Sequence, residues 1–173
     1  FNTPDMAGST RSYEAARRLA RSGHKVVIIT SYRDGVAKSY DADSVDGFLV
    51  HWLNVPYSNK MGFLRRLLAF FKFVFLASWV SRKYPSDVIF ATSTPLTIFI
   101  PAFVASKLNR SPIVFEVRDL WPDVPIGMGL LKNKFLVFLA RRLEQFAYNR
   151  SAHIVALSND MKKVLVSKGV MDA

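Results

Sequence analysis

An arginine and an aspartate stand side by side near the middle of the sequence, where they could bind a polar ligand. Arg118 and Asp119 directly follow the apolar run 112–117 and precede Trp121 and Pro122. In open α/β sheets ligands bind outside the carboxyl ends of the strands, so a strand at 112–117 would present both side chains to a ligand. The alternative is a local ion pair and a Trp-Pro turn that covers the core. We favour a functional role, because binding residues concentrate on loops that a rigid scaffold positions.

A second candidate is the loop PDMAGST at residues 4–10, which precedes the first predicted helix. Small residues such as Gly8 and Ser9 let backbone amides approach a ligand, and the amino end of a helix attracts phosphate and other anions. Ser9 or Thr10 can also cap that helix. A single glycine is equally consistent with a plain turn that needs a positive φ. Both interpretations of this loop stay open.

Segment 61–83 is a third candidate, because it mixes apolar side chains with the cations Arg65, Arg66 and Lys72. These charges make it a poor transmembrane helix. On a helical wheel one face is predicted to pack on the core, and its residues are Phe63, Leu64, Leu67, Phe71, Val74 and Phe75. The opposite face carries the three cations with Phe73, Leu76 and Val80. Basic residues beside exposed aromatics are typical of a helix resting on anionic lipid, and the alternative is a helix buried on two sides with snorkelling cations.

The elements that position these candidates follow from the alternation of apolar runs and amphipathic segments. Residues 24–30 form a continuous β-branched run, which is typical of a parallel strand covered on both faces. Strands are predicted at 24–30, 47–53, 87–92, 112–117 and 153–157. Helices are predicted at 9–22, 61–83, 95–108, 131–149 and 159–168. Strands alternating with helices indicate βαβ units and an α/β fold with an open, doubly wound parallel sheet.

Length and composition favour one ordinary globular domain. The chain has 173 residues, of which 50% are hydrophobic, which suffices for one core and is too little for two comfortable ones. We therefore expect a single domain over 1–173. In doubly wound folds a central strand normally precedes the loop now at 1–8. Either such a strand lies ahead of residue 1 or the sheet lacks it.

The charge balance indicates an anionic partner. The net charge is +11, which favours nucleic acid, anionic lipid or phosphate-bearing substrates, unless an acidic partner domain balances it. No recognition-helix or aromatic-platform motif supports nucleic acid, so we expect none. The absence of cysteine and the scattered positions of three histidines predict no disulfide and no metal site. The first residues lack a signal-peptide pattern, so a cytoplasmic location is expected.

Three stretches of the sequence resemble a known enzyme family. The stretch AGSTRSYEAARRLARSGHKVVIITS resembles the start of the retaining GT-B glycosyltransferases of family four. VFEVRDLWPDVPIGMG is similar to the bacterial surface-polysaccharide members, of the colanic-acid and O-antigen type. HIVALSNDMKKVLVSKGV resembles the last strand and helix of their N-terminal domain. The resemblance covers nearly the whole chain, and RDLWPD is its most specific part.

The resemblance implies a GT-B architecture, in which two Rossmann-like domains face each other across a cleft. Residues 1–173 would be the N-terminal, acceptor-side domain, and a C-terminal domain absent from this sequence would bind the nucleotide sugar. Transfer would be metal-independent, would retain the anomeric configuration and would need no cofactor besides the nucleotide-sugar co-substrate. The leaving diphosphate would need electrostatic stabilisation, supplied by the C-terminal domain. The chain by itself is therefore expected to be inactive.

The resemblance also assigns roles to individual residues. Gly8 matches the second glycine of the family's Gly-Gly loop, with Ser9 and Thr10 beyond it, and Ala7 replaces the first glycine. Asp119 matches the aspartate of the family's His-Asp pair. Arg118 stands where many relatives have histidine, and a cation at this position could hold a charged acceptor or the diphosphate. The catalytic residues expected from the resemblance are therefore Asp119 and Arg118.

The expected function is transfer of a sugar from a nucleotide-sugar donor to a lipid-linked or polysaccharide acceptor, in the biosynthesis of cell-surface polysaccharide or lipopolysaccharide. The protein would be peripheral at the cytoplasmic face of a bacterial membrane, where Arg65, Arg66 and Lys72 would face anionic lipid. Two alternatives stay open. One is a stand-alone Rossmann-like module that binds a nucleotide or phosphate, and the other is a membrane-surface scaffold without catalysis.

Overall fold

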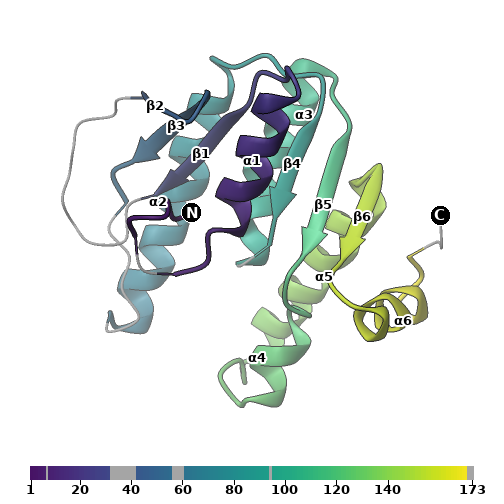
Figure 1. The fold of residues 1–173 in the computed structure, drawn as a ribbon. Helices are drawn as coiled ribbons and strands as arrows, with labels where there is room; N and C mark the ends of the chain where they lie inside the picture. The colour runs from purple at the N-terminus through teal and green to yellow at the C-terminus, as the bar shows by residue number, and fades with distance from the viewer. Residues whose placement is uncertain (7, 32–41, 56–60, 94, 171–173) are drawn as a thin grey trace. The chain divides into compact units, whose positions relative to one another are not determined.

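The computed structural model describes residues 1–6, 8–31, 42–55, 61–93 and 95–170, apart from the side chains of Phe63 and Leu64. Over these residues the chain is mixed α/β with parallel strands, which confirms the predicted fold class (Figure 1). It divides into two compact units, Phe1–Tyr84 and Pro85–Ala173. The described strands form two three-stranded sheets, one in each unit. The expectation of a single domain over 1–173 stays a prediction.

The sheet of the first unit has the strand order β1-β3-β2. Strand β1 (Val27–Ser31) runs parallel to β3 (Phe48–Leu53), and β2 (Ala42–Val45) runs antiparallel to β3. Helix α1 (Arg11–Arg21) packs on β3, and helix α2 (Phe63–Ser81) packs on β1 and β3. The predicted strands at 24–30 and 47–53 and the predicted helices at 9–22 and 61–83 are thereby confirmed, with slightly shorter bounds.

Strand β3 lies at the centre of the first unit and has buried side chains on both faces. Val50 and Trp52 pack in one cluster with Tyr13 of α1. Leu53 packs in a second cluster with Val80 of α2. Successive side chains of a strand point to opposite faces, so the two clusters lie on opposite sides of β3. Such two-sided burial explains the nearly continuous apolar sequence of this strand.

The sequence analysis did not predict β2, which is short and polar. It joins β3 through the turn Asp46-Gly47, where φ is 43° and 88°. Two positive φ values at an Asp-Gly pair are typical of the type I′ turn of hairpins. The hydroxyl of Tyr13 donates a hydrogen bond to the Asp46 carboxylate, and this bond raises the pKa of Tyr13. The hairpin thus anchors the first turn of α1.

The sheet of the second unit is parallel, with the order β4-β5-β6. Its strands, β4 (Ile89–Thr92), β5 (Ile113–Val117) and β6 (His153–Ala156), match the three predicted ones. Between β4 and β5 the chain forms a 3-10 turn, η1 (Leu96–Ile98), and helix α3 (Phe99–Asn109). The helix predicted at 95–108 is therefore confirmed except for its tighter first turn.

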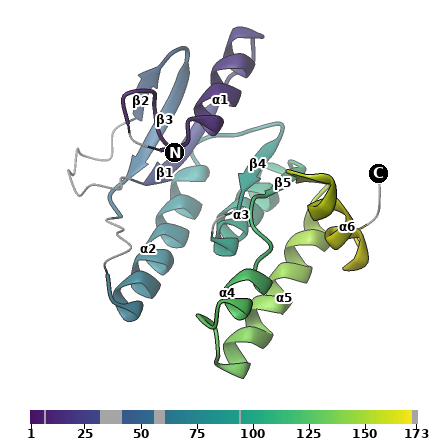
Figure 2. The same cartoon turned by 60° about the horizontal axis from the view of Figure 1, so that its bottom comes forward.

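Three more helices complete the second unit, and Figure 2 shows α4 beside the amino-terminal end of α5. They are α4 (Asp123–Gly127), α5 (Lys134–Arg150) and α6 (Asn159–Ser167). The side chain of Asn133 accepts hydrogen bonds from two amides of the first turn of α5, and Ser158 accepts one from Met161 in α6. These caps fix where both helices begin. Helix α4 was not predicted, because Pro125 and the glycines near it indicated a loop.

Buried aromatic and aliphatic side chains from every layer of the second unit form one core. Phe99 of α3 and Phe115 of β5 are almost fully buried, with ring centroids 5.3 Å apart in an edge-to-face arrangement. Ala147 of α5 and Leu165 of α6 belong to the same cluster. Burying a side chain such as Phe99 contributes about 1.5–3 kcal/mol. This core fixes β5, and with it the start of the loop that carries Arg118 and Asp119.

The predicted orientation of α2 is wrong. Phe71 and Phe75, which we expected to face the core, are 65% and 68% exposed. Phe73, Leu76 and Val80, from the face expected to be outside, pack on the buried cluster instead. The side chains of Phe63 and Leu64 lie outside the described part of the chain.

The reason for the error is that α2 is apolar on all sides, so its hydrophobic pattern does not select a face. Small side chains decide instead. Ala69 and Ala77 lie on the packed side, where they let the helix approach the sheet closely.

Candidate functional site

The carboxyl end of β5 is held to the end of β4 by three hydrogen bonds that involve side chains or strand-end backbone. The Thr92 hydroxyl donates to the buried Glu116 carboxylate over 2.6 Å, and the Ser93 amide donates to the Glu116 carbonyl over 2.9 Å. The Arg118 amide donates to the Ser93 hydroxyl oxygen, also over 2.9 Å. Ser93 is only 2% exposed. The backbone is therefore fixed up to Arg118, the first residue of the predicted site.

Arg118 and Asp119 both have exposed side chains just beyond this fixed strand end. The Asp119 carbonyl accepts a hydrogen bond from the Trp121 amide over 2.8 Å, and the following Trp121–Pro122 peptide bond is cis. The Val124 amide then donates to the Leu120 carbonyl as α4 begins. A tight turn between a rigid strand and a helix thus places an exposed arginine and an exposed aspartate at consecutive positions.

This arrangement can do two kinds of chemistry. An arginine guanidinium offers planar donors that match the oxygens of phosphate or carboxylate. A carboxylate such as that of Asp119 can accept a proton, or a hydrogen bond, from a ligand hydroxyl. Neighbouring groups of these two types suit a ligand that bears both an anionic group and hydroxyls. The predicted strand before Arg118 and Asp119 is confirmed, and their role in a site stays a prediction.

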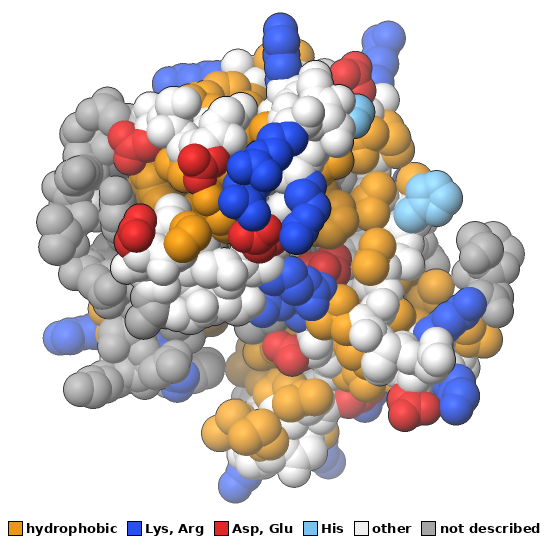
Figure 3. All heavy atoms as spheres, in the orientation of Figure 1, with side chains coloured by type: hydrophobic (Ala, Val, Ile, Leu, Met, Phe, Trp, Pro, Cys, Tyr) orange, Lys and Arg blue, Asp and Glu red, His pale blue; other side chains and the backbone are white. Residues whose placement is uncertain are grey.

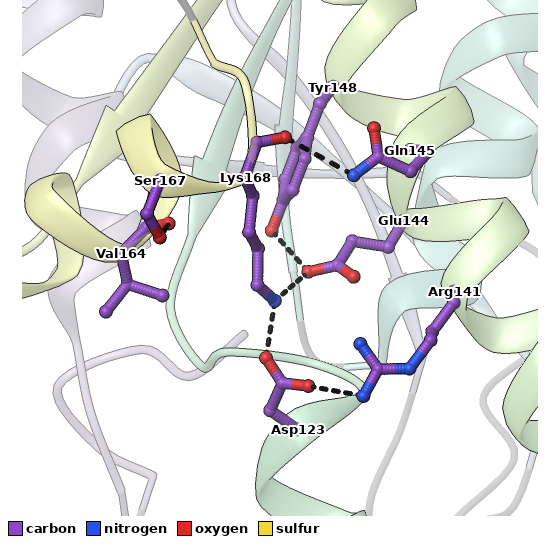
Figure 4. Close-up of polar contacts among 8 residues, drawn as sticks. All are labelled: Asp123, Arg141, Glu144, Gln145, Tyr148, Val164, Ser167 and Lys168. Carbon is purple, nitrogen blue, oxygen red and sulfur yellow. Dashed lines mark hydrogen bonds and ion pairs between the residues drawn. The ribbon is translucent and has the colours of Figure 1, made fainter.

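A buried ionic network holds α4, which continues this loop, against α5 and the end of α6 (Figure 4). The Lys168 ammonium contacts Asp123 of α4 and Glu144 of α5, each at 2.5 Å. The Tyr148 hydroxyl donates to the same Glu144 oxygen over 3.1 Å, and Arg141 lies 3.3 Å from the second oxygen of Asp123. Glu144 is 2% exposed and the Lys168 side chain 16%. A single lysine therefore joins three elements.

The network changes the proton affinity of two of its members. Burial and the neighbouring Glu144 raise the pKa of Tyr148 well above its usual range. Burial alone would lower the pKa of Lys168, but its hydrogen bonds to Asp123 and Glu144 and the charges of both carboxylates raise it above the ordinary value. At neutral pH Lys168 is charged and Tyr148 is a hydrogen-bond donor, as the observed contacts require.

The predicted loop of Gly8, Ser9 and Thr10 lies in the first unit, ahead of α1. Gly8 has a φ of 131°, a conformation that favours glycine. The Asn2 side-chain amide donates to the Ser9 carbonyl over 3.3 Å. Thr10 is the N-cap residue of α1, but its side chain makes no capping hydrogen bond. The Ser9 hydroxyl lies 3.5 Å from the Arg11 amide, a long contact. The predicted helix start is thus confirmed without the expected side-chain cap.

The three predicted surface cations are not equally exposed. Arg65 and Lys72 of α2 are exposed, whereas Arg66 is half-buried and its Nε atom is buried with no hydrogen-bond partner among the described residues. Four apolar residues near Lys72 in the helix are between 56% and 68% exposed. We call them the α2 stripe, and they are Leu68, Phe71, Phe75 and Trp79. Over the described residues no helix is both long and apolar enough to span a bilayer.

Arg118 and Asp119 lie in the second unit, while Gly8, Ser9 and Thr10 lie in the first. The sequence analysis missed Ser93 and Glu116, which fix the strand end, and Lys168, which holds the following helix. Glu116 could have been noticed as the one charged residue inside an apolar strand. Lys168 gave no local signal, because its partners lie 24 and 45 residues away.

No cluster of three or more histidine, aspartate or glutamate side chains within the described ranges could hold a metal ion. A hollow lies between α5, β6 and α6, where residues such as His153, Ser158 and Lys162 line it. Neither Arg118 nor Asp119 lines this hollow.

Comparison with known proteins identifies the family of the chain. The family described as "Glycosyl transferase 4-like domain" matches residues 7–173, which is nearly the whole chain and includes both units. No curated protein matches the sequence. The matched range contains the Gly8 loop, the α2 stripe and the Arg118–Asp119 pair. The chain therefore belongs to the glycosyl transferase 4-like domain family, and glycosyl transfer is the chemistry that this membership supports.

Proposed function

We propose that this chain is the acceptor-side part of a retaining, metal-independent glycosyltransferase of the GT-B type. The donor would be a nucleotide sugar bound mainly by another domain. The acceptor would be a lipid-linked sugar or a growing surface polysaccharide, at the inner face of a bacterial cytoplasmic membrane. Family membership supports glycosyl transfer in general, and the finer statements rest on the arguments below.

The observation that carries the proposal is the exposed Arg118–Asp119 pair at the fixed end of β5. Because Ser93 holds the Arg118 amide, little backbone entropy remains to be lost when a ligand binds. In this proposal Asp119 accepts a hydrogen bond or proton from an acceptor hydroxyl, which makes its oxygen more nucleophilic. Arg118 binds an anionic group of the acceptor or of the leaving diphosphate. Its guanidinium stabilises the charge that develops as the donor bond breaks.

The Gly8 loop would contribute backbone donors in the first unit. The side chain of Thr10 makes no capping bond, so it leaves the first amides of α1 to other acceptors. The partial positive charge at a helix amino end favours an anion at that place. We assign Gly8, Ser9 and Thr10 to a phosphate of the donor or to the acceptor.

The α2 stripe supports a membrane location. Leu68, Phe71, Phe75 and Trp79 expose their side chains on one side of a helix, beside the exposed cation Lys72. Residues 61–83 contain no acidic residue. Apolar and aromatic groups beside cations are typical of helices that lie in the interface of an anionic bilayer. The observed exposed face of α2 carries Phe71 and Phe75, which the helical wheel had assigned to the core, and these large rings suit contact with lipid.

A transfer assay tests the catalytic part of the proposal. We would incubate the full-length protein with radiolabelled UDP- and GDP-sugars and a lipid-diphosphate-linked sugar, and compare Asp119→Ala with Asp160→Ala. Asp160 is an exposed aspartate of α6, paired with Lys163, and serves as the matched control. Loss of a general base lowers transfer by about 100-fold or more. Equal transfer by the two variants would remove Asp119 from the site.

A vesicle-binding experiment tests the membrane part. Trp79 is 56% exposed and belongs to the α2 stripe, so its fluorescence reports on that stripe directly. Brominated anionic vesicles should quench Trp79 in the wild-type protein, and a protein carrying Arg65→Glu, Arg66→Glu and Lys72→Glu should lose the quenching. Trp79→Phe, which leaves Trp52 and Trp121, gives the background signal. Unchanged quenching of Trp79 in the triple variant would contradict the assignment of these cations to lipid.

A further inference from the structure

A second apolar and basic surface lies in the second unit, where α4 meets the start of α5. We call it the α4–α5 tip and define it by Met128, Leu130, Phe135, Phe138 and Leu139. These side chains are between 45% and 72% exposed. Figure 3 shows hydrophobic side chains gathered at the end where Figure 1 places α4 and the start of α5, with Lys and Arg side chains close by. The sequence analysis did not single out this surface.

The tip is a built structure and not a fraying end. Asn133 caps α5 through two hydrogen bonds, so the helix begins directly beside the exposed residues. Asp123 of α4 is held by Lys168 and by Arg141 of α5. The amides of Leu130 and Leu131 both donate to the Pro125 carbonyl. The polar groups of this region thus turn inward to hold α4 and α5 together, while large apolar side chains remain in solvent.

Charge decides which partner fits this surface. Residues 124–142, all of which the structure describes, contain Lys132, Lys134, Arg141 and Arg142 and no acidic residue. Arg142 lies over the ring of Phe138, with its guanidinium carbon 5.3 Å from the ring centroid. Protein–protein interfaces are enriched in Met, Phe and Arg but depleted in lysine, so Lys132 and Lys134 favour a different partner. Aromatic and aliphatic side chains that alternate with lysine and arginine are typical of surfaces that rest on anionic lipid.

We propose that the α4–α5 tip inserts its apolar side chains into the surface of an anionic bilayer. Met128 and Leu130, on the connection between α4 and α5, would reach the boundary between headgroups and acyl chains. Lys132 and Lys134 would contact lipid phosphates. This contact rests on residues that the proposed function does not use, so it holds or fails separately from the chemistry of Arg118 and Asp119 and from the α2 stripe. Insertion of the tip would bring the loop between β5 and α4 close to lipid.

Site-specific labelling tests this inference directly. The chain contains no cysteine, so Met128→Cys gives one labelling site for an environment-sensitive fluorophore such as NBD. Leu108→Cys, on α3 and 52% exposed, is the matched control, and Phe71→Cys reports on the α2 stripe. With phosphatidylglycerol-containing vesicles, the label at 128 should shift to the blue and be quenched by spin-labelled lipid. The label at 108 should not change. Pure phosphatidylcholine vesicles should give a much weaker response.

Charge and apolar variants separate the two contributions. Each basic residue near an anionic surface increases partitioning about fivefold, so Lys132→Gln with Lys134→Gln should weaken vesicle binding about 25-fold. For the apolar contribution, the fluorophore is placed at Phe135→Cys. The double substitution Met128→Ser and Leu130→Ser should remove the insertion signal of this label, whereas the control Leu108→Ser should leave the signal unchanged. Circular dichroism and the unfolding midpoint verify that these exposed substitutions leave the fold intact.

The possible results distinguish the partners. A lipid-dependent blue shift of the label at position 71 without one at position 128 would overturn the inference and leave the proposed membrane role of α2 unaffected. A blue shift at 128 that grows with protein concentration in the absence of lipid would show that a second copy covers the tip, and would also overturn it. A response at 128 in a protein whose Asp119→Ala variant still transfers sugar would support the tip and contradict the proposed catalytic role.

Discussion

The α2 stripe and the α4–α5 tip expose similar side chains, but different forces hold them in place. Helix α2 is fixed by apolar packing, in which Ala77 and Val80 are buried against Leu53 of the first sheet. The tip depends on ions in addition to its helix cap and backbone hydrogen bonds, because Lys168 joins Asp123 to the buried Glu144. Apolar packing is non-directional and spreads over many contacts. A buried ionic network depends on each partner, so the tip should be far more sensitive to a single substitution.

The largest predicted effect is therefore the loss of Lys168. Lys168→Met leaves Glu144 and Asp123 without their shared cation, and removing one partner of a buried ion pair costs about 3–5 kcal/mol. Urea denaturation measures this change in the free energy of unfolding. Lys163→Met is the matched control, because Lys163 pairs with Asp160 at the surface of the same helix. Exposed pairs contribute about 0–1 kcal/mol. Similar losses in the two variants would contradict the role given to the network.

The next effect concerns the face of α2 that packs on the sheet. Phe73→Ala removes a partly buried ring and should cost about 2–3 kcal/mol, less than the value for a fully buried phenylalanine. Phe71→Ala, two residues away and 65% exposed, should change the free energy of unfolding by less than about 0.5 kcal/mol. Thermal and urea unfolding of both variants checks the difference. A larger loss of stability in Phe71→Ala than in Phe73→Ala would support the orientation that the helical wheel predicted.

A smaller effect is expected at the end of β5. Ser93→Ala leaves the Arg118 amide without its acceptor, which should cost about 1–2 kcal/mol because the serine is buried. Ser167→Ala, whose hydroxyl donates to Val164 at the surface of α6, should cost less than about 0.5 kcal/mol. Ser93→Ala should also lower sugar transfer, since the Arg118–Asp119 turn loses its anchor. Full transfer by a destabilised Ser93→Ala protein would show that the anchor serves the fold alone.

The last effect is a loss of stability at high pH, to which Tyr148 and Lys168 of the second unit contribute together with Tyr13 of the first. The pKa values of Lys168 and Tyr148 are raised on folding. Their contribution is therefore fully present below the unfolded values of about 10 to 10.5 and is lost as the pH rises through the folded values. The free energy of unfolding should be flat between about pH 7 and 9 and fall above pH 10, where each of the two groups contributes at most about 1.4 kcal/mol per pH unit. Tyr148→Phe should fall less steeply, and equal slopes would contradict this account.

Much of the fold follows from the local pattern of the sequence. The five predicted strands and five predicted helices are all present among the described residues, because each has an apolar pattern of its own period. Strand β2 was missed although the Asp46-Gly47 pair that forms its turn is a hairpin signal, since the strand itself is polar. Helix α4 was missed because it spans five residues and includes Pro125.

The parts of the site that could not be predicted depend on contacts between distant residues. Arg118 and Asp119 were proposed as site residues because they follow a strand directly, and the rule for strand ends is local. Ser93 supports them from 25 residues away, and Lys168 reaches Asp123 across 45 residues. The exposed face of α2 was also beyond local reasoning, because the packing of Ala69 and Ala77 against the sheet decided it.

The most direct test of the account is a kinetic comparison of acceptor and donor for the Asp119→Asn variant of the full-length protein. If the end of β5 handles the acceptor, the variant should show a lower kcat and a changed KM for a lipid-diphosphate-linked sugar. The KM for the nucleotide sugar should stay near that of the wild type, since the proposed function assigns donor binding mainly to another domain. A change confined to the nucleotide-sugar KM, with kcat and the acceptor KM unaltered, would contradict the acceptor-side assignment.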